Sequence, residues 1–298
     1  MNAKPQGLPR LAGCLLSLGL LLPSLALAGP EELVSAERTF AAAVVAQGEK
    51  SAFLQHLDTE GLLFRPQPVR ATDFFASAPP NDGLLEWAPA YARLAKSGDL
   101  GFTTGPWGHR SARTNLSYQA HGQYLTVWRR TPAGWKAAID AGIGSPPTPF
   151  PTRVRTDGPE DADEPLPAWQ QTQRGRDLKF VEESFGARSA RQGEAVALEA
   201  YGHRRVLVLR QGSLPVTGRA EAIRFLAANR LRTRDALQGL QVSAAGDLGY
   251  AWGESELLGS GPTPARTVRS WVRVWRRSGW SGTWRVALDL AIDYPSPP

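Results

Sequence analysis

The stretch Gly98-Asp99-Leu100-Gly101-Phe102 returns later in the chain as Gly246-Asp247-Leu248-Gly249-Tyr250. A second stretch, Val127-Trp128-Arg129-Arg130, returns as Val274-Trp275-Arg276-Arg277 at nearly the same distance. Gln-Gly-Glu also occurs twice, at 47–49 and at 192–194. A period of roughly 150 residues is the size of a domain and too long for a solenoid repeat. The chain therefore contains an internal duplication, and each copy is expected to bury its own core.

Residues 1–28 have the pattern of a secretory signal. Lys4 and Arg10 supply positive charge, an apolar run follows, and Ala26-Leu27-Ala28 forms a small-x-small cleavage site. We therefore expect an exported chain, periplasmic or secreted, that begins at Gly29 and keeps no stable membrane anchor.

Two other interpretations of this segment exist. Leu11-Ala12-Gly13-Cys14 spells a lipobox, which predicts acylation of Cys14. The apolar run follows this cysteine instead of preceding it, so cleavage after Ala28 is favoured. An uncleaved anchor helix is disfavoured by Pro23 and by a run shorter than the ~20 residues that span a bilayer.

Composition excludes several function classes. Cys14 is the single cysteine, so a mature chain without it has no disulfide and no thiolate metal site. The four histidines show no helical metal-binding spacing, so neither a metal nor a cofactor is expected. The formal charge is +6, or +4 without Lys4 and Arg10, and it forms no Lys/Arg block. This pattern gives no reason to expect nucleic acid as a partner.

A proline-rich acidic segment at residues 146–168 divides the chain. Dense prolines favour extended backbone and clustered carboxylates repel one another, so the segment is expected to act as a semi-rigid spacer. It separates a first domain, residues 29–145, from a second, residues 169–298. We expect the two domains to pack as an intramolecular pseudo-dimer.

Each copy shows the same order of elements. An amphipathic helix ends at a glycine in both copies, at residues 30–47 and 178–191. Short helices and short apolar strands follow, and the second half of each copy reads as hairpins. Helices followed by a meander of antiparallel strands predict an α+β fold in which helices cover one face of a curved sheet.

The motifs of the first copy resemble a known group of domains. The stretches concerned are Leu62-Leu63-Phe64-Arg65-Pro66, residues 97–102, and Val127-Trp128-Arg129-Arg130 with the Gly134-Trp135-Lys136 that follows. Together with the leading helix they are similar to the SnoaL-like and ketosteroid-isomerase-like branch of the nuclear-transport-factor-two-like superfamily, in its group of unknown function. The resemblance covers residues 31–143 and, more loosely, residues 178–293.

This resemblance implies two cone-shaped domains, each a strongly bent antiparallel sheet covered by helices, in a cystatin-like α+β barrel. Such domains enclose one pocket and serve isomerases, cyclases, dehydratases and noncatalytic binding or scaffold proteins. The tyrosine and carboxylic acid that isomerases use to hold an enolate cannot be matched to positions here. The resemblance therefore implies a shape and leaves the chemistry open.

His56 and Asp58 are the candidate catalytic residues. They lie two residues apart, after a short predicted helix and before the first strand, so that both reach the mouth of a pocket as an acid/base pair. The alternative is an ordinary surface loop that ends a helix. The second copy has Tyr201 and His203 at the matching positions.

Three aromatic residues distinguish the first copy. Trp87, Tyr91 and Trp107 correspond to Asp235, Gly239 and Ser255 in the second copy. Aromatic rings line pockets for apolar ligands, although core packing is the alternative.

Asp140 lies in the last strand of the first copy, on the same face as Lys136. It lines a cavity or pairs with that lysine. We predict that Trp87, Tyr91, Trp107 and Asp140 form a ligand pocket in the first domain.

The sequence thus predicts an exported tandem-domain protein that binds an unknown small organic ligand in its first domain, with a noncatalytic binding or scaffold role. The alternative is a cofactor-independent isomerase, cyclase or hydratase that uses His56 and Asp58.

Overall fold

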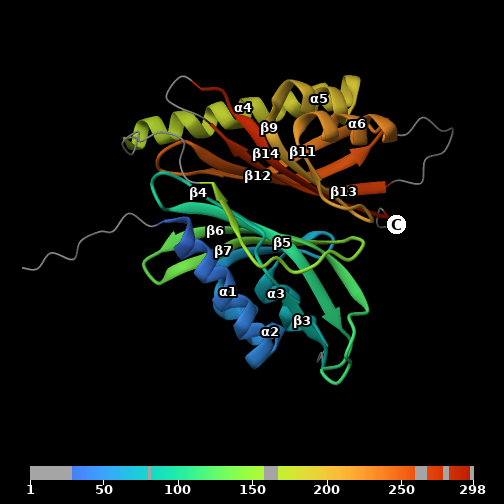
Figure 1. Ribbon diagram of the computed structural model, residues 1–298. Helices are drawn as coiled ribbons and strands as arrows, with labels where there is room; N and C mark the ends of the chain where they lie inside the picture. The colour runs from blue at the N-terminus through green and yellow to red at the C-terminus, as the bar shows by residue number, and fades with distance from the viewer. Residues whose placement is uncertain (1–28, 80–81, 158–166, 259–266, 278–281, 296–298) are drawn as a thin grey trace, which may run out of the picture.

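The computed structural model describes residues 29–79, 82–157, 167–258, 267–277 and 282–295. The predicted signal segment and its cleavage site lie outside these residues. Within the described part of the chain, no helix is long and apolar enough to cross a membrane. The described residues form two α+β domains, which confirms the predicted fold class (Figure 1).

Domain 1 combines helices with an eight-stranded sheet. Its helices are α1 (Pro30–Gln47), α2 (Glu49–His56) and α3 (Ala71–Ser77). Its strands are β1 (Leu57–Phe64), β2 (Pro68–Arg70), β3 (Leu84–Trp87), β4 (Tyr91–Leu94), β5 (Leu100–Arg110), β6 (Ala120–Thr131), β7 (Gly134–Gly144) and β8 (Arg155–Asp157). The strand order is β2-β1-β7-β6-β5-β4-β8, and β3 also pairs with β5.

Domain 2 repeats this topology in a six-stranded sheet of order β10-β9-β14-β13-β12-β11. Its helices are α4 (Ala168–Gln192), α5 (Glu194–Tyr201) and α6 (Arg219–Asn229). Its strands are β9 (Gly202–Arg210), β10 (Val216–Thr217), β11 (Thr233–Val242), β12 (Leu248–Leu257), β13 (Thr267–Arg276) and β14 (Arg285–Pro295). Helix α4 begins ten residues before the predicted start, because its first turns are polar and lack an apolar period.

Gly48 and Gly193 end the first helix of each domain. Their φ angles are 85° and 97°, a region that glycine adopts at no steric cost. The N–H of Gly48 donates to the carbonyl of Val44 at 2.9 Å, which terminates α1. The next residue, Glu49 in domain 1 and Glu194 in domain 2, then opens a second helix.

The repeated Gly-Asp turns contact each other between the domains. The Asp99 carboxylate accepts a hydrogen bond from the backbone N–H of Ala244 at 2.9 Å. The Asp247 carboxylate accepts one from the backbone N–H of Lys96 at 3.1 Å. The exchange is reciprocal, as in a two-fold symmetric interface. The most strongly repeated motif of the sequence therefore lies at the contact between the copies.

One apolar cluster joins the two sheets. It contains residues from both domains: Phe64, Ala95, Leu100, Phe102, Leu125, Val127, Ile139, Ala141, Ile143, Leu209, Leu248, Tyr250, Val272, Val274, Leu288, Leu290 and Ile292. The sheets lie face to face, with the helices of each domain on the far side (Figure 1). Each domain keeps a further apolar cluster beneath its own helices. One face of each sheet is therefore used for the contact, and the other face remains to enclose a site.

Part of the proline-rich segment packs against domain 1, contrary to the spacer expected from its composition. Strand β8 pairs in parallel with β4, Arg155 opposite Tyr91 and Asp157 opposite Arg93. The Tyr91 hydroxyl donates to Asp157 at 3.0 Å, and the Arg155 guanidinium lies 4.7 Å from the centre of the Tyr91 ring. The proline-rich composition predicts an extended backbone for this segment. It does not predict that the segment pairs with the edge strand β4.

Candidate functional site

Domain 1 has an open cavity of 360 Å³ between α2 and the inner face of its sheet. Its apolar walls include Phe53, Leu85, Trp87 and Trp107. Its polar lining consists of Glu49, Arg65, His109, Tyr124 and Asp140. A concave, mainly apolar surface with a few convergent polar groups is typical of small-molecule sites.

Hydrogen bonds hold the two tryptophans of the wall in place. The Trp107 indole N–H donates to the backbone carbonyls of Gln123 at 3.2 Å and Ile143 at 3.1 Å. The Trp87 indole N–H donates to Glu37 Oε1 at 2.5 Å. Both rings are therefore fixed before a ligand arrives, so less side-chain conformational entropy is lost when the ligand binds.

Glu37 anchors this wall from behind. Its carboxyl group is fully buried and also accepts hydrogen bonds from Thr103 and, at 2.9 Å, from the Trp128 indole. Burial raises the pKa of Glu37 to about 7, although these hydrogen bonds act in the opposite direction. Glu37 is not among the residues that line the cavity, so it positions Trp87 and does not itself meet a ligand.

Asp140 lines the cavity and pairs with a different residue from the one expected. Its Oδ1 accepts a hydrogen bond from Arg65 at 2.6 Å, and its Oδ2 accepts one from Thr126 at 3.4 Å. Lys136 instead donates to the backbone carbonyl of Gln55. The ion pair joins the residue that follows β1 to β7, the parallel neighbour of β1, and Asp140 lines the cavity.

Tyr124 supplies a polar atom without a partner. Its side chain is 5% exposed, and among the described residues the hydroxyl has no partner at full hydrogen-bond geometry, although Thr103 acts on it weakly. Burial raises the pKa of Tyr124 well above its ordinary value, so the hydroxyl keeps its proton. A buried hydroxyl without a partner loses free energy unless another group satisfies it. This hydroxyl at the cavity wall therefore points to a ligand with a polar atom.

Glu49 and His109 also line the cavity, and the sequence analysis missed both. Burial raises the pKa of Glu49, while the charges of His109 and Arg65 act in the opposite direction. The available signal is the repeated Gln-Gly-Glu stretch, at 47–49 and at 192–194, which indicates the duplication but not a lining residue. The glycine that ends α1 directs the following glutamate to the cavity at the start of α2.

The structure brings Trp87, Trp107 and Asp140 together and places the other predicted site residues elsewhere. The His56 ring stacks on Phe40, with centroids 5.0 Å apart, and its Nδ1 lies 2.8 Å from the Ala52 carbonyl oxygen. Tyr91 packs against the cluster between the sheets.

Asp58 forms an ion pair with Arg129. Burial alone would raise the pKa of Asp58, but the hydrogen bond and charge of Arg129 outweigh it, so the pKa is lowered. Neither His56 nor Asp58 lines the domain 1 cavity.

In domain 2, buried arginine side chains pair with the acids of the corresponding region. Arg273 forms ion pairs with Glu182, with Asp235 at 2.9 Å and with Asp289 at 3.0 Å, and all four side chains are at most 5% exposed. Burial would raise the pKa of Asp289, but Arg210 and Arg273 outweigh it and lower the pKa. Domain 2 therefore compensates its buried carboxylates internally.

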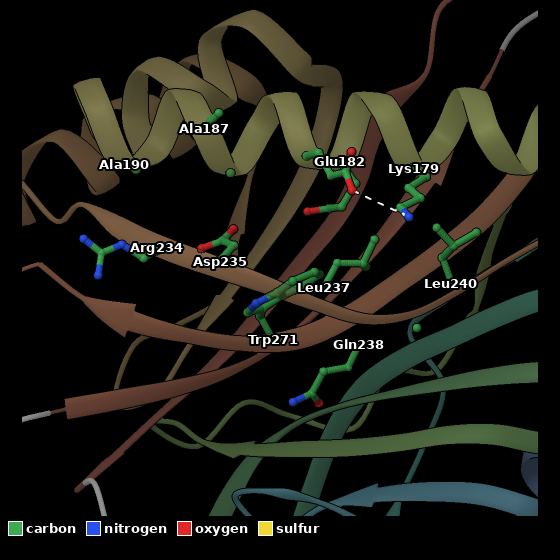
Figure 2. Close-up of a pocket in the computed structure, with 13 residues that line it drawn as sticks. Lys179, Glu182, Ala187, Ala190, Arg234, Asp235, Leu237, Gln238, Leu240 and Trp271 are labelled. Atoms are coloured by element: carbon green, nitrogen blue, oxygen red, sulfur yellow. Dashed lines mark ion pairs between the residues drawn. The ribbon is translucent and has the colours of Figure 1, made fainter.

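Domain 2 carries a groove of a different kind, 620 Å³ in volume, between α4 and the edge strand β11. Figure 2 shows Lys179 and Glu182 on the helix, Asp235 and Leu237 on the strand, and Trp271 below them. The charged groups along it are paired with each other or with neighbours: Lys179 with Glu183, and Arg234 with Glu256. The cavity of domain 1 is the better candidate site, because tryptophan rings held by hydrogen bonds line it together with several polar side chains.

No protein-family model matches the chain, and no curated protein matches it. Solved structures do. A ketosteroid isomerase-like protein from Erwinia carotovora atroseptica is 12% identical, with a TM-score of 0.36, over 41% of this chain and 96% of that one.

An NTF2-like protein of unknown function from Pseudomonas putida is 17% identical, with a TM-score of 0.34, over 40% of this chain and 86% of that one. A putative dehydratase of the NTF2-like family from Streptomyces avermitilis is 18% identical, with a TM-score of 0.34, over 43% of this chain and 99% of that one.

Proposed function

We propose that the protein is an exported binding protein that holds a small organic molecule in the cavity of domain 1, with domain 2 as its structural partner. The observation that carries this proposal is the contrast between the two interiors. Domain 1 has a cavity with fixed aromatic walls and an unpartnered Tyr124 hydroxyl. In domain 2 the carboxylates of Glu182, Asp235 and Asp289 are instead held by the buried Arg273.

A cavity-filling variant tests binding. A Cβ atom added at Gly142 would lie 3.6 Å from Trp107 Nε1 and 3.8 Å from an Arg65 nitrogen, so the position accepts a side chain without a backbone clash. We expect Gly142→Leu to remain folded and to lose binding of every hit from a calorimetric screen of small aromatic molecules. Gly175→Leu is the matched control, because a Cβ there meets nothing within 4 Å and the position lies on α4 of domain 2.

The screen has two informative outcomes. Hits that bind the parent chain and the Gly175→Leu variant but not Gly142→Leu support the cavity as the site. Hits whose affinity is unchanged in Gly142→Leu would place binding elsewhere and contradict the proposal.

Export is tested by mass. Intact-mass analysis of the exported protein is expected to show a chain that begins at Gly29. A mature form that begins at an acylated Cys14 would replace this with a membrane-anchored lipoprotein.

A second candidate function is cofactor-independent acid/base catalysis of the isomerase, cyclase or hydratase type. Glu49 favours it: this carboxyl group lines the cavity, and burial raises its pKa toward the range in which a general acid or base operates. Glu49 and His109 replace His56 and Asp58 as the acid/base candidates, because they line the same cavity. Turnover of a screening hit that Glu49→Gln abolishes, with binding retained, would favour the enzyme over the binding protein.

A further inference from the structure

The outer edge of the sheet differs between the two domains. Leu94 pairs opposite Gly101 and Val242 opposite Gly249, and both glycines belong to the repeated motif, so β4 corresponds to residues 239–242 of β11. In domain 1, β8 pairs with β4 in parallel and also lies against α1. In domain 2, β11 is the last strand of the sheet, and no other described strand pairs with its outer side.

Strand β11 is a long edge strand. It spans 10 residues, whereas the other strands that end the two sheet orders, β2, β8 and β10, span 3, 3 and 2. Proteins commonly shorten or cover their edge strands, because the N–H and C=O groups along an open edge pair readily with another chain. Arg234, Ala236 and Gln238 of β11 are exposed. The edge is therefore accessible to a further strand.

The groove of domain 2 runs along this edge, between α4 and β11 (Figure 2). In domain 1 the Trp87 side chain bridges the corresponding strand and helix, because its indole donates to Glu37 on α1 at 2.5 Å. The counterpart Asp235 is shorter and accepts hydrogen bonds from Ser255 at 2.8 Å and from Arg273 at 2.9 Å. Domain 2 therefore has a groove where domain 1 has an aromatic side chain of its own.

The groove contains a buried hydrogen-bond donor. Trp271 lines the groove and is 0% exposed, and its indole N–H has no hydrogen-bond partner among the described residues. The Trp275 indole on the same strand donates to Glu182 at 2.7 Å. A buried N–H without an acceptor costs free energy, so an oxygen atom brought into the groove would be stabilised there.

The lining favours an uncharged side chain. Its apolar part consists of Ala187, Ala190, Leu237 and Leu240 together with Trp271. The charged groups are already paired within domain 2, Lys179 with Glu183, Arg234 with Glu256, and Asp235 with Arg273. An ionic ligand would therefore find no charge of the opposite sign that is not already compensated.

We propose that β11 and the adjoining groove bind an extended peptide segment of a partner protein. The segment adds to the sheet in parallel with β11, as β8 does on β4, and places one aromatic or large aliphatic side chain between the strand and α4. The Arg155 N–H donates to the Ala90 carbonyl at 2.9 Å, and Gln238 is the counterpart of Ala90. In this mode of recognition the main chain supplies affinity and the groove supplies selectivity. The proposal is independent of the domain 1 cavity.

A phage-displayed library of random short peptides, selected on the full mature chain, provides the probe. Enriched peptides are expected to share one aromatic or large aliphatic residue and to bind as free peptides in isothermal titration. Only alternate N–H groups of an added strand face the sheet. N-methylation of one alternate set is therefore expected to weaken binding by about 10-fold or more, and of the other set to change it little. No enriched peptide, or equal effects of the two sets, would overturn the proposal.

A groove-filling variant locates the peptide. Ala187 is exposed and lines the groove, so Ala187→Trp is expected to leave the melting temperature unchanged and to weaken binding by about 10-fold or more. Arg191→Trp is the matched control, because Arg191 is exposed on the same helix but does not line the groove. Binding that Ala187→Trp leaves intact would place the peptide elsewhere and overturn the proposal.

Hydrogen exchange of the parent chain gives a readout that needs no variant. The peptide is expected to slow amide exchange in residues 237–242 and to change residues 91–94 little, because β8 already covers that edge. Protection confined to another edge would contradict the proposal. Sedimentation of the peptide-free chain tests a second copy as the occupant. A dimer that Ala187→Trp dissociates would assign the edge to self-association and overturn the proposal.

Discussion

The two domains bury equivalent glutamates, Glu37 and Glu182, and satisfy them differently. In domain 1, neutral donors hold the carboxyl group: the indoles of Trp87 and Trp128 and the hydroxyl of Thr103. In domain 2, the Trp275 indole is retained at 2.7 Å, and the Arg273 guanidinium replaces the other donors. One fold with equivalent buried acids therefore satisfies them with neutral donors in one copy and with a guanidinium in the other.

This comparison predicts its largest effect at Arg273. Replacing it by methionine leaves Glu182, Asp235 and Asp289 buried without this cation, so Arg273→Met is expected to lower the free energy of unfolding by about 3–5 kcal/mol. The matched change in domain 1, Thr126→Val, removes one long hydrogen bond to Asp140 and is expected to cost about 1 kcal/mol. Urea denaturation followed by fluorescence measures both. If Arg273→Met and Thr126→Val lower the free energy of unfolding equally, the buried acids of domain 2 do not depend on Arg273 as proposed.

The pH dependence of stability is the second test. The pKa of Glu37 rises from 4.5 to about 7 on folding, so the folded state holds a proton that the unfolded state releases between these values. Stability is therefore expected to fall as pH rises from about 4.5 to 7, by at most about 3 kcal/mol from this group.

Glu37→Gln removes the titrating group and should flatten this part of the profile. Thermal unfolding of the parent chain and the variant across the range checks the sign. A profile whose slope in this range is unchanged by Glu37→Gln would contradict the raised pKa.

The third test concerns Trp87 and its counterpart Asp235. Trp87→Ala removes a wall of the cavity and is expected to weaken ligand binding by about 10-fold to 100-fold. Asp235→Ala is expected to leave binding unchanged but to lower stability, because Asp235 pairs with buried Arg273. Titration of a screening hit and thermal unfolding separate the two effects. Loss of binding in Asp235→Ala with retention in Trp87→Ala would reverse the assignment of the pocket.

The smallest effect is expected from cutting the chain between the domains. The proline-rich segment is the predicted site of rapid proteolysis, because its sequence lacks the apolar periodicity of a packed element. The two pieces should remain associated after cleavage, since one apolar cluster contains residues from both sheets. Gel filtration of the cleaved protein measures this. Separation of the pieces would show that the contact between the sheets depends on the covalent connection.

The repeated motifs predicted much of the fold, and the structure gives the physical reason. Asp99 and Asp247 recur because each accepts a backbone hydrogen bond from the other copy. Gly48 and Gly193 recur because each ends a helix with a positive φ. Such residues meet the same backbone requirement in both copies, so a comparison of the copies finds them.

The candidate site was predicted only in part. Trp87 and Trp107 differ between the copies, and Asp140 lies on an alternating strand, so the sequence indicated all three. Tyr91 has the same aromatic character but lies at the cluster between the sheets, because its position faces the opposite side of the sheet from the cavity. A one-residue change in strand register exchanges the two faces, and the sequence alone does not state which face is enclosed.

The sequence by itself determined the duplication, the α+β class and the residues that distinguish the copies, because these follow from local periodicity and turn chemistry. Only the tertiary structure decided which carboxylates meet which cations. Arg65 and Asp140 are 75 residues apart in the chain and 2.6 Å apart in space, and Arg273 reaches Glu182 on a helix 91 residues away. How a buried carboxylate is compensated depends on such long-range pairs, since an arginine compensates a buried charge only where the fold brings the two together.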